Sequence, residues 1–377
     1  MGDETKSPDE IDEKDILRDF FDQKLSIEQE TFELRRRRLL TFSKSYYPMT
    51  VTIPHEKEPS PQILFSLLSK RAKTISKLIR WSPLDIRLKF NRQSQIQLRC
   101  SINQGRNWVI THDKRKKSAG YPHFESILTG PKVSNHLFLN DDGNATEDLK
   151  KMTEHICEVF CSPICEIQID KQSLIEWLIK FQPLIRYVSI RKDVVTSFES
   201  LDRLFQNVRV TERFLLGSIK LNGNSQYTEP IPFRSITITG SSWVTLPSIL
   251  NGTNSIIRLH GSKLSPKDIN TILKEWQMGF KLYNLEFLEV DISTLLNLDS
   301  FPGEVLKDLS VTRNDGNDGR PTTVKIHDEY IITLPLAHIV FNLARNDGMI
   351  GSFFAYRVNE GERMMIIFYF QVWSKQS

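Results

Sequence analysis

Cysteine and histidine residues at close spacing are the first candidates for chemistry in this sequence. Cys157, Cys161 and Cys165 recur every four residues, and His155 precedes them. Thiolate and imidazole groups bind zinc, but a structural zinc site usually needs closer cysteine pairs and a fourth ligand from elsewhere. Pro163 also interrupts any single helix that would align the three thiols. We therefore expect small buried cysteines here and no metal site.

A second candidate is the run of Asx-Gly pairs at residues 314–319, which looks like a calcium-binding loop. If Asp315 took the first position of such a loop, the sixth would be Arg320 and the twelfth Ile326. A calcium loop needs glycine at the sixth position and a bidentate glutamate at the twelfth. Asx-Gly pairs are strong turn formers, so the run predicts a turn.

The sequence has none of the common catalytic motifs. It contains no His-Glu-x-x-His, no phosphate-binding loop ending in Gly-Lys-Ser/Thr and no Gly-x-Ser-x-Gly. We therefore expect a protein that is not an enzyme and that needs no cofactor.

The charges are distributed in blocks. Residues 1–34 contain 12 acidic and 4 basic residues, whereas residues 35–120 contain 20 basic and 4 acidic ones. Trp81, Phe90 and Trp108 lie within the basic segment, and clustered cations with aromatic rings are typical of nucleic-acid binding. A solvated charged surface explains the same pattern. The run Lys114, Arg115, Lys116 and Lys117 fits a nuclear import signal or an ordinary surface loop.

Composition and length predict an intracellular, folded protein. The 377 residues are enough for about two domains, and 39% of them are hydrophobic. Four cysteines cannot form a disulfide framework, and we find neither a signal peptide nor an apolar run of about 18 residues. We expect a charged helical extension (1–45), a proline-rich linker (46–62), a helix (63–80), a basic strand segment (81–120) and a large C-terminal domain (121–377).

The C-terminal domain contains a repeated apolar pattern. Apolar residues at relative positions 1, 4 and 6, as in the strand of a leucine-rich repeat, recur with helix-like segments between several of them. The seven copies begin at Ile164, Ile185, Leu216, Phe233, Asn254, Leu285 and Leu306. Such strands bury their apolar face by stacking, so we predict an α/β fold of leucine-rich-repeat-like β-α units. Residues 353–373 predict a β-hairpin that caps the sheet.

Part of this domain resembles a known family. The segment 236–246, ITITGSSWVTL, together with later residues up to 291, is similar to the nematode-type F-box-associated domain, with weaker likeness over about 120–377. The matching positions that we expect to be structural are Trp243, Leu264, Asp268, Trp276, Leu285 and Leu288. In this family the domain is thought to present the substrate of a cullin-type ubiquitin ligase. The resemblance therefore implies a substrate-recruiting adaptor in the cytoplasm or nucleus, with an unknown protein substrate.

A second stretch, ILFSLLSKRAK at 63–73, is similar to the later part of an F-box. The resemblance implies binding of a Skp-type linker subunit through Leu64, Leu67, Leu68, Lys70 and Arg71. A complete F-box opens with an apolar helix, but this sequence has four prolines between positions 48 and 61. Losing about 400 Å² of apolar contact would cost on the order of 10 kcal/mol, so the incomplete F-box puts linker binding in doubt. The alternative function is nucleic-acid binding through residues 35–120.

Overall fold

The structure is a computed structural model of the chain. It describes residues 63, 66–67, 69–78, 84–91, 93–100, 103–112, 123–129, 132–139, 144–220, 225–292, 301–314, 319–327, 329–360 and 363–374. All of these belong to one compact unit, residues 58–377. The predicted extension (1–45), the predicted linker (46–62), Leu64 and Leu68 lie outside the described residues.

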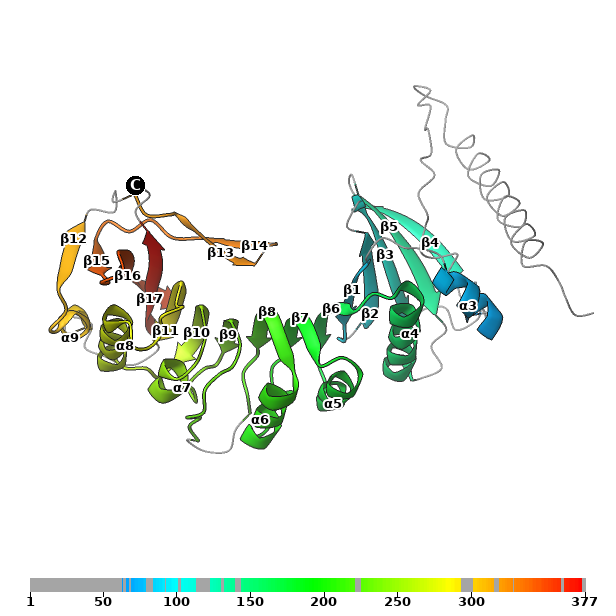
Figure 1. The fold of residues 1–377 in the computed structure, drawn as a ribbon, viewed down its shortest axis with the longest axis horizontal. Coiled ribbons are helices and arrows are strands. Elements are labelled where there is room, and N and C mark those ends of the chain that lie inside the picture. Colours follow the sequence, from blue (N-terminus) through cyan, green and yellow to red (C-terminus); the bar gives the residue numbers. More distant parts are fainter. Residues whose placement is uncertain are drawn as a thin grey trace, which may run out of the picture. The chain divides into compact units, whose positions relative to one another are not determined.

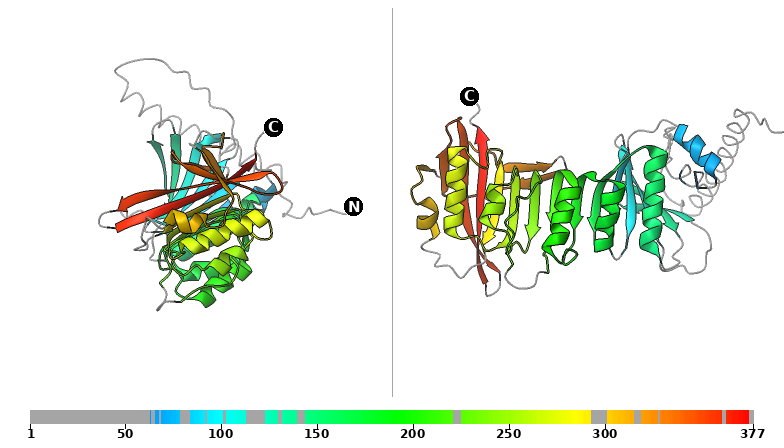
Figure 2. Two further views of the ribbon diagram at one scale, coloured as in Figure 1. Left: turned by 90° about the vertical axis from the view of Figure 1, so that its left-hand side faces the viewer. Right: turned by 60° about the horizontal axis from the view of Figure 1, so that its bottom comes forward.

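Six parallel strands form the middle of a 15-stranded sheet (Figure 1). In sheet order they are β6 (Ile164–Ile169), β7 (Leu184–Ile190), β8 (Arg209–Leu216), β9 (Ser235–Thr239), β10 (Ile256–Ser262) and β11 (Phe287–Ile292). The connecting helices are α5 (Gln172–Phe181), α6 (Phe198–Asn207), α7 (Leu246–Leu250) and α8 (Pro266–Met278). These helices lie along one face of the sheet, as Figures 1 and 2 show. The fold is therefore mixed α/β, as the sequence predicts.

Two rows of apolar side chains cross these strands on the helix-covered face. The first row is Ile167, Val188, Phe214, Ile236, Ile257 and Leu288, and the second is Ile169, Ile190, Leu216, Ile238, Leu259 and Val290. Each of these side chains is at most 2% exposed. Burial of one such side chain contributes about 1.5–3 kcal/mol, so the two rows are a main source of the stability of this region.

The predicted strand register is correct in five places and wrong in two. The copies beginning at 164, 185, 233, 254 and 285 coincide with β6, β7, β9, β10 and β11. Leu216, however, is the last residue of β8, so the copy that begins there is wrong. The 1-4-6 spacing is hidden in β8 because a β-bulge gives this strand one extra residue opposite β7. The copy at Leu306 is also wrong, since Leu306 ends helix α9 (Phe301–Leu306) and the strand after it leaves the parallel run.

Further strands, in parallel and antiparallel pairs, extend the sheet beyond β6. β1 (Leu84–Lys89) pairs with β6 in parallel and with β2 (Gln95–Cys100) in antiparallel orientation. The remaining strands at this end are β3 (Asn103–His112), β5 (Lys132–Leu139) and β4 (His123–Thr129). β1 to β3 lie in the basic strand segment (81–120) that the sequence predicts. Helix α4 (Ala145–Phe160) precedes β6, and α3 (Lys70–Leu78) packs against α4.

Beyond β11 the sheet continues with antiparallel strands from the C-terminal part of the chain. These are β17 (Arg363–Ser374), β16 (Met349–Glu360), β15 (Val340–Ala344) and β12 (Val311–Asn314). The predicted hairpin corresponds to β16 and β17, but it lies within the sheet, because β15 and β12 follow it. β13 (Thr323–His327) and β14 (Tyr330–Thr333) form a separate two-stranded sheet.

Candidate functional site

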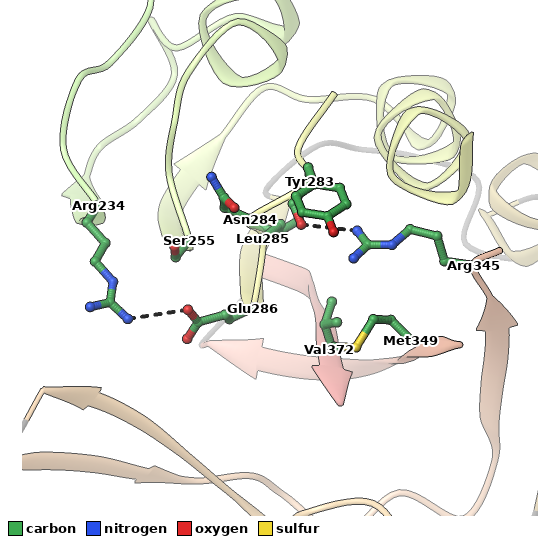
Figure 3. A pocket seen from close by; sticks show the side chains of 9 residues that line it. All are labelled: Arg234, Ser255, Tyr283, Asn284, Leu285, Glu286, Arg345, Met349 and Val372. Carbon is green, nitrogen blue, oxygen red and sulfur yellow. Dashed lines mark hydrogen bonds and ion pairs between the residues drawn. The ribbon is translucent and has the colours of Figure 1, made fainter. Parts of the chain in front are cut away.

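A pocket of about 390 Å³ opens at the edge of the sheet where strands β9, β10 and β11 begin. Arg234 and Ser255 directly precede β9 and β10, and residues 283–286 precede β11. Arg345, Met349 and Val372, from the region of β15 to β17, form the other side. Figure 3 shows this arrangement, with Met349 and Val372 between two polar walls. The pocket therefore lies between the parallel strands and the C-terminal hairpin.

The loop between α8 and β11 takes its shape from local capping. Gly279 ends α8 with a positive φ of 74°, a conformation that glycine adopts without strain. The backbone N–H of Leu285 donates to the carbonyl of Leu282, and the N–H of Glu286 donates to the carbonyl of Ser255. These bonds fix the chain beside the start of β10, and they leave the Tyr283 side chain 61% exposed at the mouth of the pocket.

Arg345 forms one wall and is held from several sides, although it is only 7% exposed. Its guanidinium donates to both carboxylate oxygens of Asp347, at 2.8–3.0 Å, and to the carbonyl oxygen of Tyr283 at 3.1 Å. It also lies 4.8 Å from the ring centroid of Trp276 and 4.6 Å from that of Tyr283. The Arg345 hydrogen bonds lower the pKa of Asp347, so this pair stays ionised and keeps the Tyr283 ring in place.

The opposite wall is an exposed ion pair. An Arg234 nitrogen lies 3.3 Å from a Glu286 oxygen, and both side chains are more than half exposed. Exposed pairs contribute about 0–1 kcal/mol, so either group is free to exchange its partner for a ligand. The pocket is thus rigid on the Arg345 side and adaptable on the Arg234 side.

Exposed apolar side chains lie near Tyr283 in the sequence, at the end of α8 and in the loop that follows it. Met278 is 51% exposed and Phe280 is 83% exposed, close to Tyr283 in the chain. Single exposed apolar residues are common, but three within six residues beside a pocket favour a contact surface for another molecule. Aromatic and methionine side chains are enriched in such interfaces.

The three cysteines at positions 157, 161 and 165 do not form a metal site in the described part of the chain. Burial raises the pKa of Cys157 and of Cys165 to about 12, so both thiols are protonated at neutral pH. Cys161 is exposed and ends α4 in a left-handed conformation with φ of 49°. Among the described residues, no group of three or more His, Cys, Asp or Glu side chains is placed to hold a metal ion. The described chain also has no helix that is long and apolar enough to cross a membrane.

The residues singled out from the family resemblance are mostly buried. Trp243, Leu264, Trp276, Leu285 and Leu288 are each at most 3% exposed. The sixth, Asp268, completes a capping box with Ser265 at the start of α8: its carboxylate accepts from the Ser265 backbone N–H at 2.7 Å. Leu285 and Trp276 also support the pocket. No local pattern in the sequence predicts Arg234, Glu286 or Arg345, because the pocket depends on contacts between distant segments.

Of the residues predicted to bind the linker subunit, the three that the structure describes are exposed. Leu67 is 45% exposed, and Lys70 and Arg71 are exposed as well. The opposite side of α3 is attached to α4: Lys73 and Lys77 pair with Glu158, and the Ser66 hydroxyl lies 2.7 Å from Nε2 of His155. The outward side therefore remains as the part of α3 that could meet a partner.

Comparison with known proteins gives one match. Residues 230–290 match the family model described as F-box associated. No curated protein and no solved structure matches the chain. The matched segment runs from the residues before β9 into β11, and it contains the pocket residues Arg234, Ser255, Tyr283 and Glu286. The part of the chain that builds this wall of the pocket, residues 230–290, is therefore similar to the F-box-associated family.

Proposed function

We propose that this protein is a non-enzymatic, substrate-recruiting adaptor of a cullin-type ubiquitin ligase, acting in the cytoplasm or nucleus. One observation carries the proposal: the F-box-associated segment builds one wall of the pocket, and it also contains the exposed side chains of Met278, Phe280 and Tyr283. A protein-interaction role follows from the family, and the pocket is where we place the substrate contact.

The site suits the docking of a protein segment. Strongly bound interface residues are usually apolar or aromatic anchors that enter a preformed pocket. Leu285, Met349 and Val372 supply an apolar lining, Tyr283 also lines the pocket, and Phe280 is exposed three residues before Tyr283. The support is rigid, because the pocket rests on parallel strands that we interpret as a leucine-rich-repeat-like stack.

The linker subunit would have to bind the outward side of α3. Arg71, Thr74 and Leu78 are spaced by three or four residues along α3 and are all exposed, so they form one stripe, and Leu67, which precedes the helix, is exposed as well. Leu78 is 74% exposed. Since the other side of α3 is occupied by α4, a Skp-type subunit can use this stripe without detaching the helix.

The alternative, nucleic-acid binding through residues 35–120, receives less support. In the described part of that segment, Arg87 is only 6% exposed and pairs with Glu166 at 3.0 Å. Lys73 and Lys77 are engaged by Glu158. These cations neutralise acidic groups of the same chain, so fewer positive charges are free for phosphates than the composition suggests.

Co-purification of the full-length chain with a recombinant Skp-type linker subunit tests the proposal. We expect binding by the wild-type chain, loss of binding in Leu67→Asp/Leu78→Asp, and normal binding in Phe280→Ala/Tyr283→Ala. The last variant should instead lose ubiquitylation of its substrate in cells. Leu184→Ala is the matched control, because Leu184 is 53% exposed and does not line the pocket. Failure of the wild-type chain to bind the subunit would refute the adaptor role.

A further inference from the structure

The two-stranded sheet β13–β14 lies across the face of the large sheet that carries no helices (Figure 1). We call residues 323–333, without residue 328, the strap. The strap is not a member of the large sheet, so no strand pairing joins the two. Side-chain contacts alone therefore decide how firmly it is attached, and these contacts differ between its base and its tip.

The base of the strap is apolar. Val324 and Ile326 of the strap, with Leu334 directly after it, are each at most 8% exposed and belong to a small cluster between the strap and the sheet. The sheet contributes Ile256, Phe287, Val340 and Phe354 to this cluster. The base is thus anchored by burial of apolar surface, and this attraction has no directional requirement.

The tip of the strap is acidic and aromatic, and it rests among arginines. Glu329 pairs with Arg87 and lies 3.7 Å from Arg99. The His327 ring lies 4.7 Å from the ring of Tyr187 on β7. Cζ of Arg213 on β8 lies 4.6 Å from the ring centroid of Tyr330. Its hydroxyl also accepts a hydrogen bond of 3.3 Å from Arg258 on β10.

In the region of the strap tip, the arginines of the sheet outnumber the carboxylates that face them by one. The arginines in the tip region are Arg87, Arg99, Arg186, Arg213 and Arg258. The carboxylates of the sheet that face them are Asp85, Glu166, Glu212 and Glu289. Glu329 of the strap supplies the fifth negative charge.

Arg213 is the cation with the weakest partners. It forms no ion pair with any residue that the structure describes, and its Nε is buried without a hydrogen bond there. Burial lowers the pKa of Arg213, which reflects the cost of holding this charge without a carboxylate. A carboxylate presented to Arg213 from outside the strap would form a charge-assisted hydrogen bond that the strap does not make.

We propose that this arginine-rich face is a binding site for an extended acidic segment of a partner protein with aromatic residues beside its acid, and that the strap occupies the site in the free protein. The contacts of the strap tip define the chemistry: one carboxylate for Arg87 and Arg99, and flanking rings for Tyr187 and Arg213. A partner that also pairs with Arg213 displaces the tip. This inference does not rest on the ubiquitin-ligase role.

The test uses the full-length chain and a fluorescent peptide that copies residues 321–336, PTTVKIHDEYIITLPL. In Glu329→Lys the tip is repelled by Arg87 and Arg99, so the site opens. We expect this variant to bind the peptide about tenfold more tightly than the wild-type chain does, by fluorescence anisotropy. Amide hydrogen exchange in β13 and β14 should rise in the same variant. Glu329→Gln, which keeps the shape of the side chain, should change both measurements in the same direction by less.

Three controls make the test specific. Glu229→Lys changes the charge equally at an exposed position outside the strap, and it should behave as the wild-type chain does. Adding Arg213→Glu to Glu329→Lys should abolish peptide binding, and a peptide with lysine in place of its glutamate should not bind. Equal peptide affinity in the wild-type chain and in both Glu329 variants would overturn the proposal. Competition by a single-stranded oligonucleotide as effective as that by unlabelled peptide would also overturn it, because the face would then attract anions in general.

Discussion

Gly351 in β16 gives the sharpest test of how the pocket is supported. A β-carbon added at this position would contact Cε2 of Phe370, and it would lie 2.6 Å from Cζ of Phe370 and 2.9 Å from Cζ3 of Trp276. Both rings are fully buried, and they pack edge to face with centroids 5.0 Å apart. Because neither ring has space to move, Gly351→Ala must displace β16 itself.

The expected loss of stability is substantial. Overpacking a closely packed core costs about 1–3 kcal/mol, and the rigid surroundings of Gly351 place this substitution near the upper value. Gly303→Ala in α9 is the matched control, since no atom lies within 4 Å of its added β-carbon. Alanine in place of helical glycine should stabilise by about 0.5–1 kcal/mol. Gly351→Ala should therefore lower the free energy of unfolding and Gly303→Ala should raise it, so the two variants should differ by about 3–4 kcal/mol.

Urea unfolding at 25 °C, followed by circular dichroism and tryptophan fluorescence, measures both free energies. Val372 lines the pocket directly opposite Gly351 in the β16–β17 ladder, so Gly351→Ala should also weaken any ligand contact there. If Gly351→Ala had an unfolding free energy within about 0.5 kcal/mol of the wild-type value, the packing around Trp276 and Phe370 would not be as described.

Three further outcomes follow from single contacts. Lys73 and Lys77 lower the pKa of Glu158 from 4.5 to about 2, so the attachment of α3 should be complete above pH 4.5 and be lost as the pH falls toward 2. Amide exchange in α3 measures this loss. Since Glu158 is exposed, high salt should weaken the attachment too. Unchanged amide exchange of α3 in Glu158→Gln would contradict the role of these two ion pairs. Ser265→Ala removes the N-cap of α8 and should cost about 1 kcal/mol in the free energy of unfolding, whereas Ser265→Asp should retain most of it. Asn254→Ala should cost about 2 kcal/mol or more, because its buried amide donates to the carbonyls of Ile231 and Phe233; a loss below about 0.5 kcal/mol in urea unfolding would show that these carbonyls find other donors.

Local patterns predicted the parallel strands well where the strands are regular. In β6, β7, β9, β10 and β11 the apolar spacing alone identified the buried positions, because each strand must hide the same face. The pattern failed at β8, where a bulge shifts the alternation by one residue. It also failed at Leu306, whose apolar side chain belongs to a helix turn and not to a strand.

Asn254 shows how a polar residue can occupy an apolar position of the pattern. The sequence alone gives no reason for it, whereas the structure places its amide, 1% exposed, between two backbone carbonyls. The amide nitrogen thus satisfies two backbone acceptors, whereas the amide oxygen of Asn254 is buried without a hydrogen-bond partner among the described residues.

The amino-acid sequence by itself determined the α/β class, the helix-covered apolar face and the F-box-associated segment, because periodicity and capping are local properties. Tertiary structure alone decided the pocket and the strap. Arg345 reaches the pocket that Arg234 and Glu286 line only when β15 to β17 pair beside β11. Arg87 and Glu329 are 242 positions apart, and their pairing requires the strap to cross the sheet. Contacts between distant segments depend on how strands are ordered in the sheet, and no local spacing in the chain encodes that order.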